Sequence, residues 1–238
     1  MGEGSGDRRK MIAAGLVGLA VGGGAVAAVS GGSPLSGDRA QVERIVREYV
    51  LANPELIPEA MQRLQDRKTG DVVGLNRAAF ETPFGSAWAG AEKPDVVLVE
   101  FFDYACGYCR KSNADVDRLL GEDPKLRVVW RELPVLGPDS EAAAGISLAA
   151  AKQGRFRDFH EQMFDAGRPT PDAIARVQTA LGVKAGQSPE FRAELEKNVE
   201  LARAINASGT PTFVVGDRVL HGAVGYEALK EAIAAARS

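Results

Sequence analysis

The chain has 238 residues, a formal net charge of −3 and 45% hydrophobic residues. A chain of this length can form one large domain, or one domain with an appendage. The hydrophobic fraction is ordinary for a globular protein. Because the net charge is slightly negative, electrostatics give no reason to expect a nucleic acid or an anionic lipid surface as a partner.

Residues 1–37 are interpreted as an export signal followed by a Gly/Ser/Pro-rich linker. A basic segment, residues 7–10, precedes an uncharged Ala/Gly/Val-rich stretch, residues 11–29. Ala25-Val26-Ala27 is typical of a signal-peptide cleavage site. Two alternatives stay open: the stretch is just long enough to span a bilayer uncleaved, and Arg8-Arg9 resembles part of a twin-arginine signal. All three place the rest of the chain outside the cytoplasm.

Residues 38–68 are expected to form two short amphipathic helices. Asp38 is a candidate N-cap of the first helix, with Gln41 completing a capping box. The apolar residues that follow at helical spacing are Val42, Ile45, Val46, Tyr49 and Val50. Asn53-Pro54 marks the start of the second helix, and a polar connection, residues 68–76, follows it. Because short helices bury little surface alone, they pack either on the next domain or on another copy of the chain.

The middle of the chain predicts strands around a single helix. An edge strand is expected near residues 78–84, a central strand at 95–102 and a further strand at 126–133. The central run is rich in β-branched and aromatic residues, which is typical of a strand buried on both faces. A helix between the second and third of these strands predicts a parallel pair with a right-handed crossover.

Cys106 and Cys109 are the only cysteines of the chain, and they form a Cys-x-x-Cys motif directly after the central strand. Helical periodicity follows, so the motif lies at a helix N-terminus, where free N–H groups and the positive dipole end stabilise a thiolate. Cys106 is therefore predicted to be a nucleophile at neutral pH. Cys109, one turn further on, can close a reducible disulfide with it.

A zinc site and a purely structural disulfide are the competing interpretations of this motif. Zinc takes about four protein ligands, whereas the chain has no third cysteine and its histidines, His160 and His221, lie far away in sequence. A disulfide that closes so small a loop contributes little stability. A redox-active dithiol is favoured, and neither a cofactor nor a metal is expected.

A helical insertion is expected at about residues 139–187, between the second and third core strands. Ser140 is a candidate cap of its first helix, and Thr170-Pro171 marks a later helix start. His160 lies beside an apolar stripe and is interpreted as a packing residue with satisfied hydrogen bonds. A β-hairpin, residues 212–220, and an amphipathic helix complete the chain.

Three segments, found in order, resemble the DsbA-like branch of the thioredoxin superfamily. They are residues 101–109 (FFDYACGYC), 132–140 (ELPVLGPDS) and 209–213 (GTPTF). The likeness covers residues 75–238 and implies an α/β thioredoxin-like fold with an inserted helical subdomain. Residues 38–68 are similar to the N-terminal helices of the ScsC-like group, which in that group mediate oligomerisation.

The resemblance implies a role for each site residue. Cys106 matches the attacking thiol and Cys109 the resolving thiol. Pro211 matches a cis-proline that faces the dithiol; the alternative is a trans proline that opens a strand. Thr210 would offer its backbone to an extended substrate segment. Glu100, a charged residue in the central strand, matches an acid that relays protons to or from Cys109; the alternative is an exposed residue at a strand end.

Gly107 and Tyr108 lie between the cysteines, where DsbA has Pro-His, and are candidate substrate contacts. Without that histidine the thiolate loses a stabilising neighbour, so Cys106 should be less acidic and its disulfide less oxidising. Gly-Tyr is instead the dipeptide of the DsbC-type isomerases. The resemblance therefore favours an isomerase or reductase of protein disulfides.

The expected protein is periplasmic, or held at the inner membrane by an uncleaved signal. Its partners would be secreted proteins with thiols or disulfides, a membrane thiol–disulfide redox partner and further copies of itself, but no nucleic acid. Two alternatives stay open: a dithiol oxidase recycled by a membrane partner, and a non-enzymatic chaperone or metal-binding module.

Overall fold

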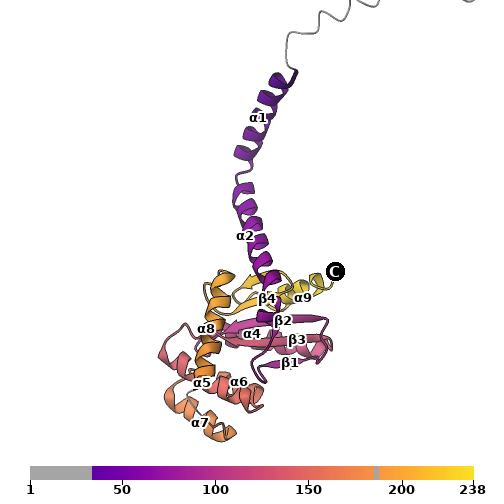
Figure 1. Ribbon diagram of the computed structural model, residues 1–238. Helices are drawn as coiled ribbons and strands as arrows, with labels where there is room; N and C mark the ends of the chain where they lie inside the picture. Colours follow the sequence, from indigo (N-terminus) through magenta and orange to yellow (C-terminus); the bar gives the residue numbers. More distant parts are fainter. Residues whose placement is uncertain (1–33, 185–187) are drawn as a thin grey trace, which may run out of the picture. The chain divides into compact units, whose positions relative to one another are not determined.

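The computed structural model of the chain describes residues 34–184 and 188–238 (Figure 1). The expected export signal lies outside these residues. The chain divides into two compact units, Met1–Glu59 and Ala60–Ser238. Within the described ranges, no helix is both long enough and apolar enough to cross a membrane.

The N-terminal region is helical, as predicted, but both helices are longer than expected. α1 spans Pro34–Ala52, so the predicted N-cap at Asp38 is wrong, because the helix has already begun there. α2 spans Leu56–Leu75 and replaces the predicted polar connection at residues 68–76. The polar composition of residues 68–76 suggested a loop, but Thr69, Gly70 and Val73 are buried, so tertiary packing keeps this segment helical.

The second unit contains a five-stranded sheet in the order β1-β3-β2-β4-β5. β2 and β3 are parallel, as predicted, and the other neighbours are antiparallel. The strands are β1 Trp88–Gly90, β2 Val96–Phe102, β3 Leu126–Glu132, β4 Thr212–Val215 and β5 Arg218–His221. β2 is therefore the middle strand, and both of its faces are covered.

The edge strand predicted near residues 78–84 is wrong, because this segment contains the helix α3, Arg77–Glu81. The edge strand is β1 instead. Phe80 is fully buried and packs edge-on against Phe101 of β2. The buried guanidinium of Arg131 on β3 donates to the carbonyl oxygens of Ala79, Phe80 and Thr82. It thereby satisfies carbonyls that the end of a short helix leaves without partners.

The remaining helices lie between and after the strands. They are α4 Gly107–Glu122, α5 Pro138–Lys152, α6 Phe156–Asp165, α7 Pro171–Leu181, α8 Pro189–Ala204 and α9 Tyr226–Ala235. α4 connects β2 to β3, and Figure 1 shows α5, α6 and α7 grouped together. The insertion between β3 and β4 therefore runs to Ala204 rather than to about residue 187, because α8 belongs to it. Thr170 caps α7 as predicted, by accepting from the N–H of Ala173.

Side chains alternate between two cores, one on each face of the sheet. Leu98, Phe102 and Trp130 belong to the core that also contains both cysteines and residues of α4, α6 and α9. Val99 and Phe101 belong to the core on the other face, with residues of α2, α3 and α8. The mixed α/β class predicted from the sequence is confirmed. The dithiol directly follows β2, a strand that is buried on both faces.

Candidate active site

The two thiols meet at the first turn of α4. Cys106 is the N-cap, and its Sγ accepts from the backbone N–H of Cys109 at 3.4 Å. Both cysteines are buried free thiols, with Cys106 6% exposed and Cys109 fully covered. The Sγ of Cys106 also lies 3.2 Å from the carbonyl oxygen of Thr210, to which Cys106 donates when it is protonated.

The environment separates the acidities of the two thiols. The hydrogen bond from Cys109 is the largest of the influences that lower the pKa of Cys106 to about 5, and the N–H groups at the helix start add to it. Burial raises the pKa of Cys109, and its bond to Cys106 and the charge of Glu100 raise it further. At neutral pH the site therefore holds one nucleophilic thiolate beside one protonated thiol.

Thr210 and Pro211 lie on the β4 side of the dithiol. The peptide bond between them is cis, as predicted. Pro211 is buried and directly precedes β4, where Thr212 pairs with Phe101 of β2. Thr210 is half-buried, and its carbonyl is the group that the Cys106 thiol contacts. The structure therefore brings together the three segments that the sequence had singled out separately.

Glu100 lies on the same face of β2 as the core that contains the cysteines, and it is fully buried. The alternative of an exposed residue at a strand end is therefore wrong. Its Oε2 accepts from the indole N–H of Trp130 at 3.0 Å, whereas its Oε1 has no partner among the described residues. Burial raises the pKa of Glu100 to about 8, and the charges of Asp117 and Cys106 add to this effect.

His160 packs in an aromatic cluster beneath the dithiol. Its ring centroid lies 4.8 Å from that of Phe102, 4.9 Å from Phe164 and 5.3 Å from Trp130. The packing role is as predicted, but the prediction of satisfied hydrogen bonds is wrong, because Nδ1 has no partner within the described ranges. Burial lowers the pKa of His160 to about 3, so the ring is neutral.

Sequence reasoning missed Asp103, the residue that follows β2 and begins the active-site loop. Its carboxylate accepts from the N–H groups of Ala105, Val135 and Leu136, and from the hydroxyl of Ser140. Ser140 was predicted to cap α5, but Gly137 occupies that position and the serine bonds Asp103 instead. The bond to Ala105 is a local turn of the kind that Asp favours, and it was the one detectable signal.

A second chain of hydrogen bonds lies behind the dithiol and was also missed. The Tyr104 hydroxyl lies 2.9 Å from Ser147 Oγ, and this oxygen donates to Glu132 Oε1 at 2.7 Å. All three side chains are buried, and burial raises the pKa of Glu132 to about 7. The chain joins the active-site loop, the end of β3 and α5.

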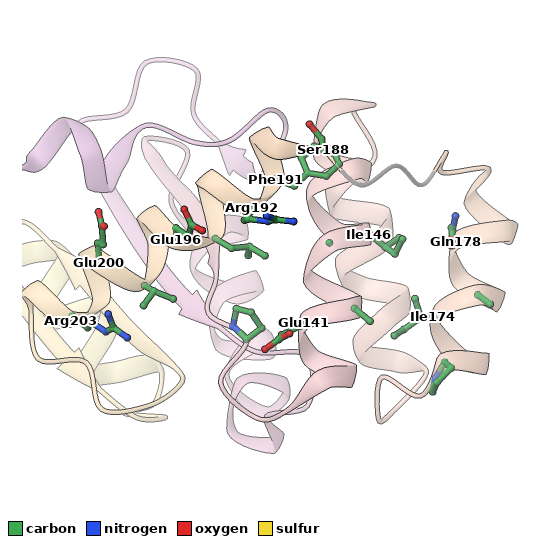
Figure 2. Close-up of a pocket in the computed structure, with 17 residues that line it drawn as sticks. Glu141, Ile146, Ile174, Gln178, Ser188, Phe191, Arg192, Glu196, Glu200 and Arg203 are labelled. Carbon is green, nitrogen blue, oxygen red and sulfur yellow. The ribbon is translucent and has the colours of Figure 1, made fainter.

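An apolar groove of about 1170 Å³ lies between α5, α7 and α8, apart from the cysteines. Figure 2 shows Ile146, Ile174 and Phe191, one from each helix, among the residues that line it, with charged side chains such as Glu196 and Arg203 along α8. Neither cysteine nor Thr210 lines it. The dithiol therefore does not open into this groove.

The model of the DSBA-like thioredoxin domain family matches residues 97–234 of this chain, and the chain belongs to that family. The model of the copper resistance protein ScsC N-terminal domain matches residues 38–69. Together with the strand order and the helix-capping dithiol, these matches confirm a thioredoxin-like DsbA fold and a member of the DsbA-like thiol–disulfide oxidoreductases.

The chain is similar to relatives with two different kinds of name. The disulfide bond formation protein D of Bacillus subtilis is 29% identical over 168 residues, which are 63% of this chain and 76% of that protein. The Na⁺/H⁺ antiporter NhaA 3 of Salinispora tropica is 32% identical over 158 residues. That match is 62% of this chain, but the chain spans only 24% of the antiporter.

Two solved structures share the fold. A thioredoxin-like oxidoreductase from Silicibacter pomeroyi superimposes with a TM-score of 0.64 and 35% identity, and covers 68% of this chain and 98% of its own. A linker-deletion mutant of Proteus mirabilis ScsC superimposes with a TM-score of 0.68 and 26% identity, and covers 87% of this chain and 98% of its own.

Proposed function

We propose that this chain is an exported thiol–disulfide isomerase or reductase that acts on protein disulfides. The observation that carries the thiol–disulfide chemistry of this proposal is the contrast between the two thiols. Cys106 has a pKa of about 5, whereas burial holds the pKa of Cys109 well above its ordinary value. In such a pair, the first sulfur attacks as a thiolate, and the second stays protonated until it resolves the mixed disulfide.

In the first step, the Cys106 thiolate attacks one sulfur of a client disulfide. The client S–S bond breaks, a mixed disulfide with Cys106 forms, and the second client sulfur leaves as a thiolate that takes up a proton. In isomerisation, another client thiolate later attacks the client sulfur of the mixed disulfide. A new client disulfide forms, and Cys106 leaves as a thiolate, unchanged in oxidation state. In reduction, Cys109 attacks Cys106, and the dithiol is oxidised as the client is reduced.

Glu100 serves the reductive branch as the base that receives the Cys109 proton. The charge of the Cys106 thiolate is one of the causes that raise the pKa of Glu100. In the mixed disulfide that charge is gone, so the carboxyl ionises more readily at the stage when Cys109 must lose its proton. The relay role predicted from the sequence is supported by this coupling and by the burial of Glu100.

The client backbone lies against Thr210 as an added strand, beside cis-Pro211. The proximity of the Thr210 carbonyl to the Cys106 Sγ, 3.2 Å, supports this position, because a client sulfur must approach the same atom. Gly107 and Tyr108 directly follow Cys106 in the first turn of α4. Both are exposed, and Tyr108 shows 68% of its surface to solvent.

Isomerisation is favoured over oxidation by the Gly107-Tyr108 pair and by the apolar stripe of α1. Val42, Ile45 and Tyr49 are each more than half exposed, and a homo-oligomer would bury them. Such an assembly presents several dithiols around one client and hinders a membrane oxidase. Export is supported by the signal-like composition of residues 1–37 and by the use of an exchangeable dithiol.

A dithiol oxidase recycled by a membrane partner is the second candidate, and the acidity of Cys106 favours it. A stabilised thiolate stabilises the reduced enzyme, which makes its disulfide more oxidising. A pKa of about 5 lies between the values of about 7 for thioredoxin and about 3.5 for DsbA. The acidity alone therefore does not decide between the two directions.

The test is scrambled-ribonuclease refolding and insulin reduction with the mature chain, together with its redox potential against glutathione. An isomerase recovers ribonuclease activity when it is supplied reduced, and its potential lies well below about −120 mV, the value of DsbA. A potential near that value, with activity only from the oxidised chain, would show an oxidase. Inactivity in both assays would exclude the proposed chemistry.

A further inference from the structure

Trp130 lies directly opposite Glu100 in the sheet. β2 and β3 are parallel, and their register pairs these two residues. Paired residues project from the same face of a sheet, and Trp130 belongs to the core that also contains both cysteines. The indole N–H donates to Glu100 Oε2 at 3.0 Å, whereas Oε1 has no partner among the described residues. One oxygen of the buried carboxyl is therefore held, and the other is free.

The indole itself is fixed by side chains of α6. Phe156 and His160 pack against the Trp130 ring, with centroids 5.6 Å and 5.3 Å from it. The guanidinium of Arg157 lies over the same ring, 5.0 Å from its centroid, as a cation–π contact. Arg157 in turn pairs with Asp117 of α4. The donor is therefore held by packing and by charge, which is the support that a pre-organised site requires.

The indole N–H favours the charged form of the carboxyl. It can donate but not accept, and a donor binds a carboxylate more strongly than a protonated carboxyl. Burial raises the pKa of Glu100 to about 8, and the bond from Trp130 is the largest of the opposing influences. The charges of Asp117 and Cys106 on α4 raise this pKa further, whereas that of Arg157 on α6 lowers it. Without the indole, the carboxyl would therefore stay protonated to a higher pH.

We propose that Trp130 is a positioning residue of the proton relay: its indole N–H holds Oε2 of Glu100 and stabilises the carboxylate, so that Oε1 takes the Cys109 proton. This inference rests on the proposed function and adds a residue to its reductive branch. The other titratable neighbours do not replace the indole. Burial keeps His160 neutral by lowering its pKa to about 3, and Cys109 is the proton donor itself.

The step balances with groups that the chain and its client supply. In the mixed disulfide, Cys109 transfers its proton to Oε1 of Glu100 and becomes a thiolate. This thiolate attacks the Sγ of Cys106, the bond between Cys106 and the client sulfur breaks, and the client leaves as a thiolate. Over attack and resolution together, the client disulfide gains two electrons and the dithiol loses two. A base is most effective when its pKa lies near the working pH, and the indole brings Glu100 closer to that range.

The test is single-turnover exchange between the reduced full mature chain and a labelled peptide whose cysteine is disulfide-linked to thionitrobenzoate. Attack by Cys106 on the peptide sulfur releases thionitrobenzoate, read by absorbance. Resolution by Cys109 releases the peptide, read by fluorescence anisotropy. In Trp130→Phe, the pH at which resolution is half-maximal should rise by about one pH unit, so resolution at pH 7 should slow about 10-fold. The rate of attack should change less than about 2-fold.

Two controls separate positioning from packing. Trp88→Phe makes the same substitution on β1, where the Trp88 ring lies under Arg127, and it should leave the pH profile of resolution unchanged. In the Glu100→Gln background, Trp130→Phe should cause no further slowing of resolution, because the indole acts through the carboxyl. If the substitution merely loosened and hydrated the core, the pKa of Glu100 would fall and the profile would move to lower pH.

A measurement on the wild-type chain covers the case in which Trp130→Phe does not fold. The chain has two tryptophans, so Trp88→Phe assigns their two indole N–H resonances in a ¹⁵N-labelled sample. The Trp130 resonance should titrate with a midpoint near pH 8, and the titration should vanish in Glu100→Gln.

The proposal would be overturned by a Trp130 resonance that does not titrate. An unchanged or lowered midpoint for resolution in Trp130→Phe, or further slowing in the Glu100→Gln background, would overturn it as well. Each of these results leaves the proposed exchange chemistry intact. A wild-type chain that releases neither thionitrobenzoate nor peptide would instead refute the proposed function itself.

Discussion

The indole N–H of Trp130 donates to Oε2 of Glu100 at 3.0 Å, and the other oxygen of this buried carboxyl has no partner among the described residues. The Trp130 ring also packs against His160, whose Nδ1 is likewise without a partner there. An unsatisfied buried polar atom costs stability. Both unsatisfied atoms therefore belong to residues that contact the same indole, that of Trp130, which lies in the core that also contains both cysteines.

Glu100→Gln should slow the steps in which Cys109 exchanges a proton and leave the first attack by Cys106 largely intact. Glutamine keeps the size and can still accept from Trp130, but it cannot take a proton at neutral pH. Stopped-flow measurement through Trp130 fluorescence separates attack from resolution. Equal rates of resolution for wild type and variant across pH would rule out the relay.

The same variant should also change how stability depends on pH. Burial raises the pKa of Glu100 from 4.5 to about 8, so the folded state holds a proton that the unfolded state has lost. The stability from this group is complete below pH 4.5 and declines as pH rises through 8. The free energy of unfolding of Glu100→Gln, measured with urea, should therefore increase relative to that of the wild type between pH 4.5 and 8. The increase should be at most about 1.4 kcal/mol per pH unit. Parallel curves for the two proteins would contradict the raised pKa.

Cys106→Ser should abolish exchange, because the chain then lacks a nucleophilic thiolate. Cys109→Ser should leave attack possible but block resolution, so mixed disulfides with clients accumulate. Non-reducing gels with scrambled ribonuclease detect these adducts. Full reductase turnover by Cys109→Ser without trapped adducts would exclude resolution within the motif, whereas slow isomerisation by Cys106 alone remains compatible with it.

The reduced and oxidised forms should differ in their response to pH. The pKa of Cys106 falls from 9.0 to about 5 on folding, chiefly because Cys109 donates to it. The resulting stability is present above pH 9 and is lost as pH falls through 5. Since the disulfide form has no thiol to titrate, the stability of the reduced form relative to the oxidised form should rise between pH 5 and 9. Urea unfolding of both forms measures this, and reduced Cys106→Ser should show no such rise.

Two glycine substitutions test the packing of the fold away from the dithiol. A Cβ at Gly145 of α5 would meet no atom within 4 Å, so Gly145→Ala should stabilise the fold by about 0.5–1 kcal/mol. Gly90 has a φ of +97°, and a Cβ there would lie 2.2 Å from the carbonyl oxygen of Leu126. Gly90→Ala should therefore destabilise by more than about 1 kcal/mol. Thermal unfolding should give a higher midpoint temperature for Gly145→Ala, and a lower one for Gly90→Ala, than for the wild type.

The sequence predicted the parts of the site whose cause is local. The composition of β2 indicates burial on both faces, and the motif after it indicates a helix start. The strand predicted at residues 78–84 is wrong because this segment forms α3, which depends on Arg131, 51 residues away from Phe80. Periodicity cannot report a partner at that distance.

The network around Asp103 escaped prediction for the same reason. Its partners Val135, Leu136 and Ser140 are 32, 33 and 37 residues away. Ser140 fits the pattern of a helix cap, yet Gly137 is the N-cap of α5, and Ser140 is buried and donates to Asp103. A sequence shows that a serine can donate a hydrogen bond, but only the fold shows to which acceptor.

The apolar stripe of α1 should hold copies of the chain together. Val42, Ile45, Val46 and Tyr49 are 54–60% exposed. Their burial between copies would contribute about 25 cal/mol for each Å² of apolar surface removed from water. Ile45→Asp with Tyr49→Asp places charges in the stripe, so the full mature chain should sediment as a monomer. Leu51→Asp is the matched control, because Leu51 is 68% exposed and lies about 180° around the helix.

The stripe variant should keep its redox potential and its insulin reduction, because the dithiol lies in the second unit, Ala60–Ser238. It should lose most scrambled-ribonuclease isomerisation and become a better substrate for a membrane oxidase, since single dithiols are more accessible than dithiols grouped around a client. Deletion of residues 38–67 should act in the same way, because it leaves the buried Thr69, Gly70 and Val73 in place. If the wild-type chain already sediments as a monomer at micromolar concentration, the stripe does not join copies, and isomerase activity loses its main structural support.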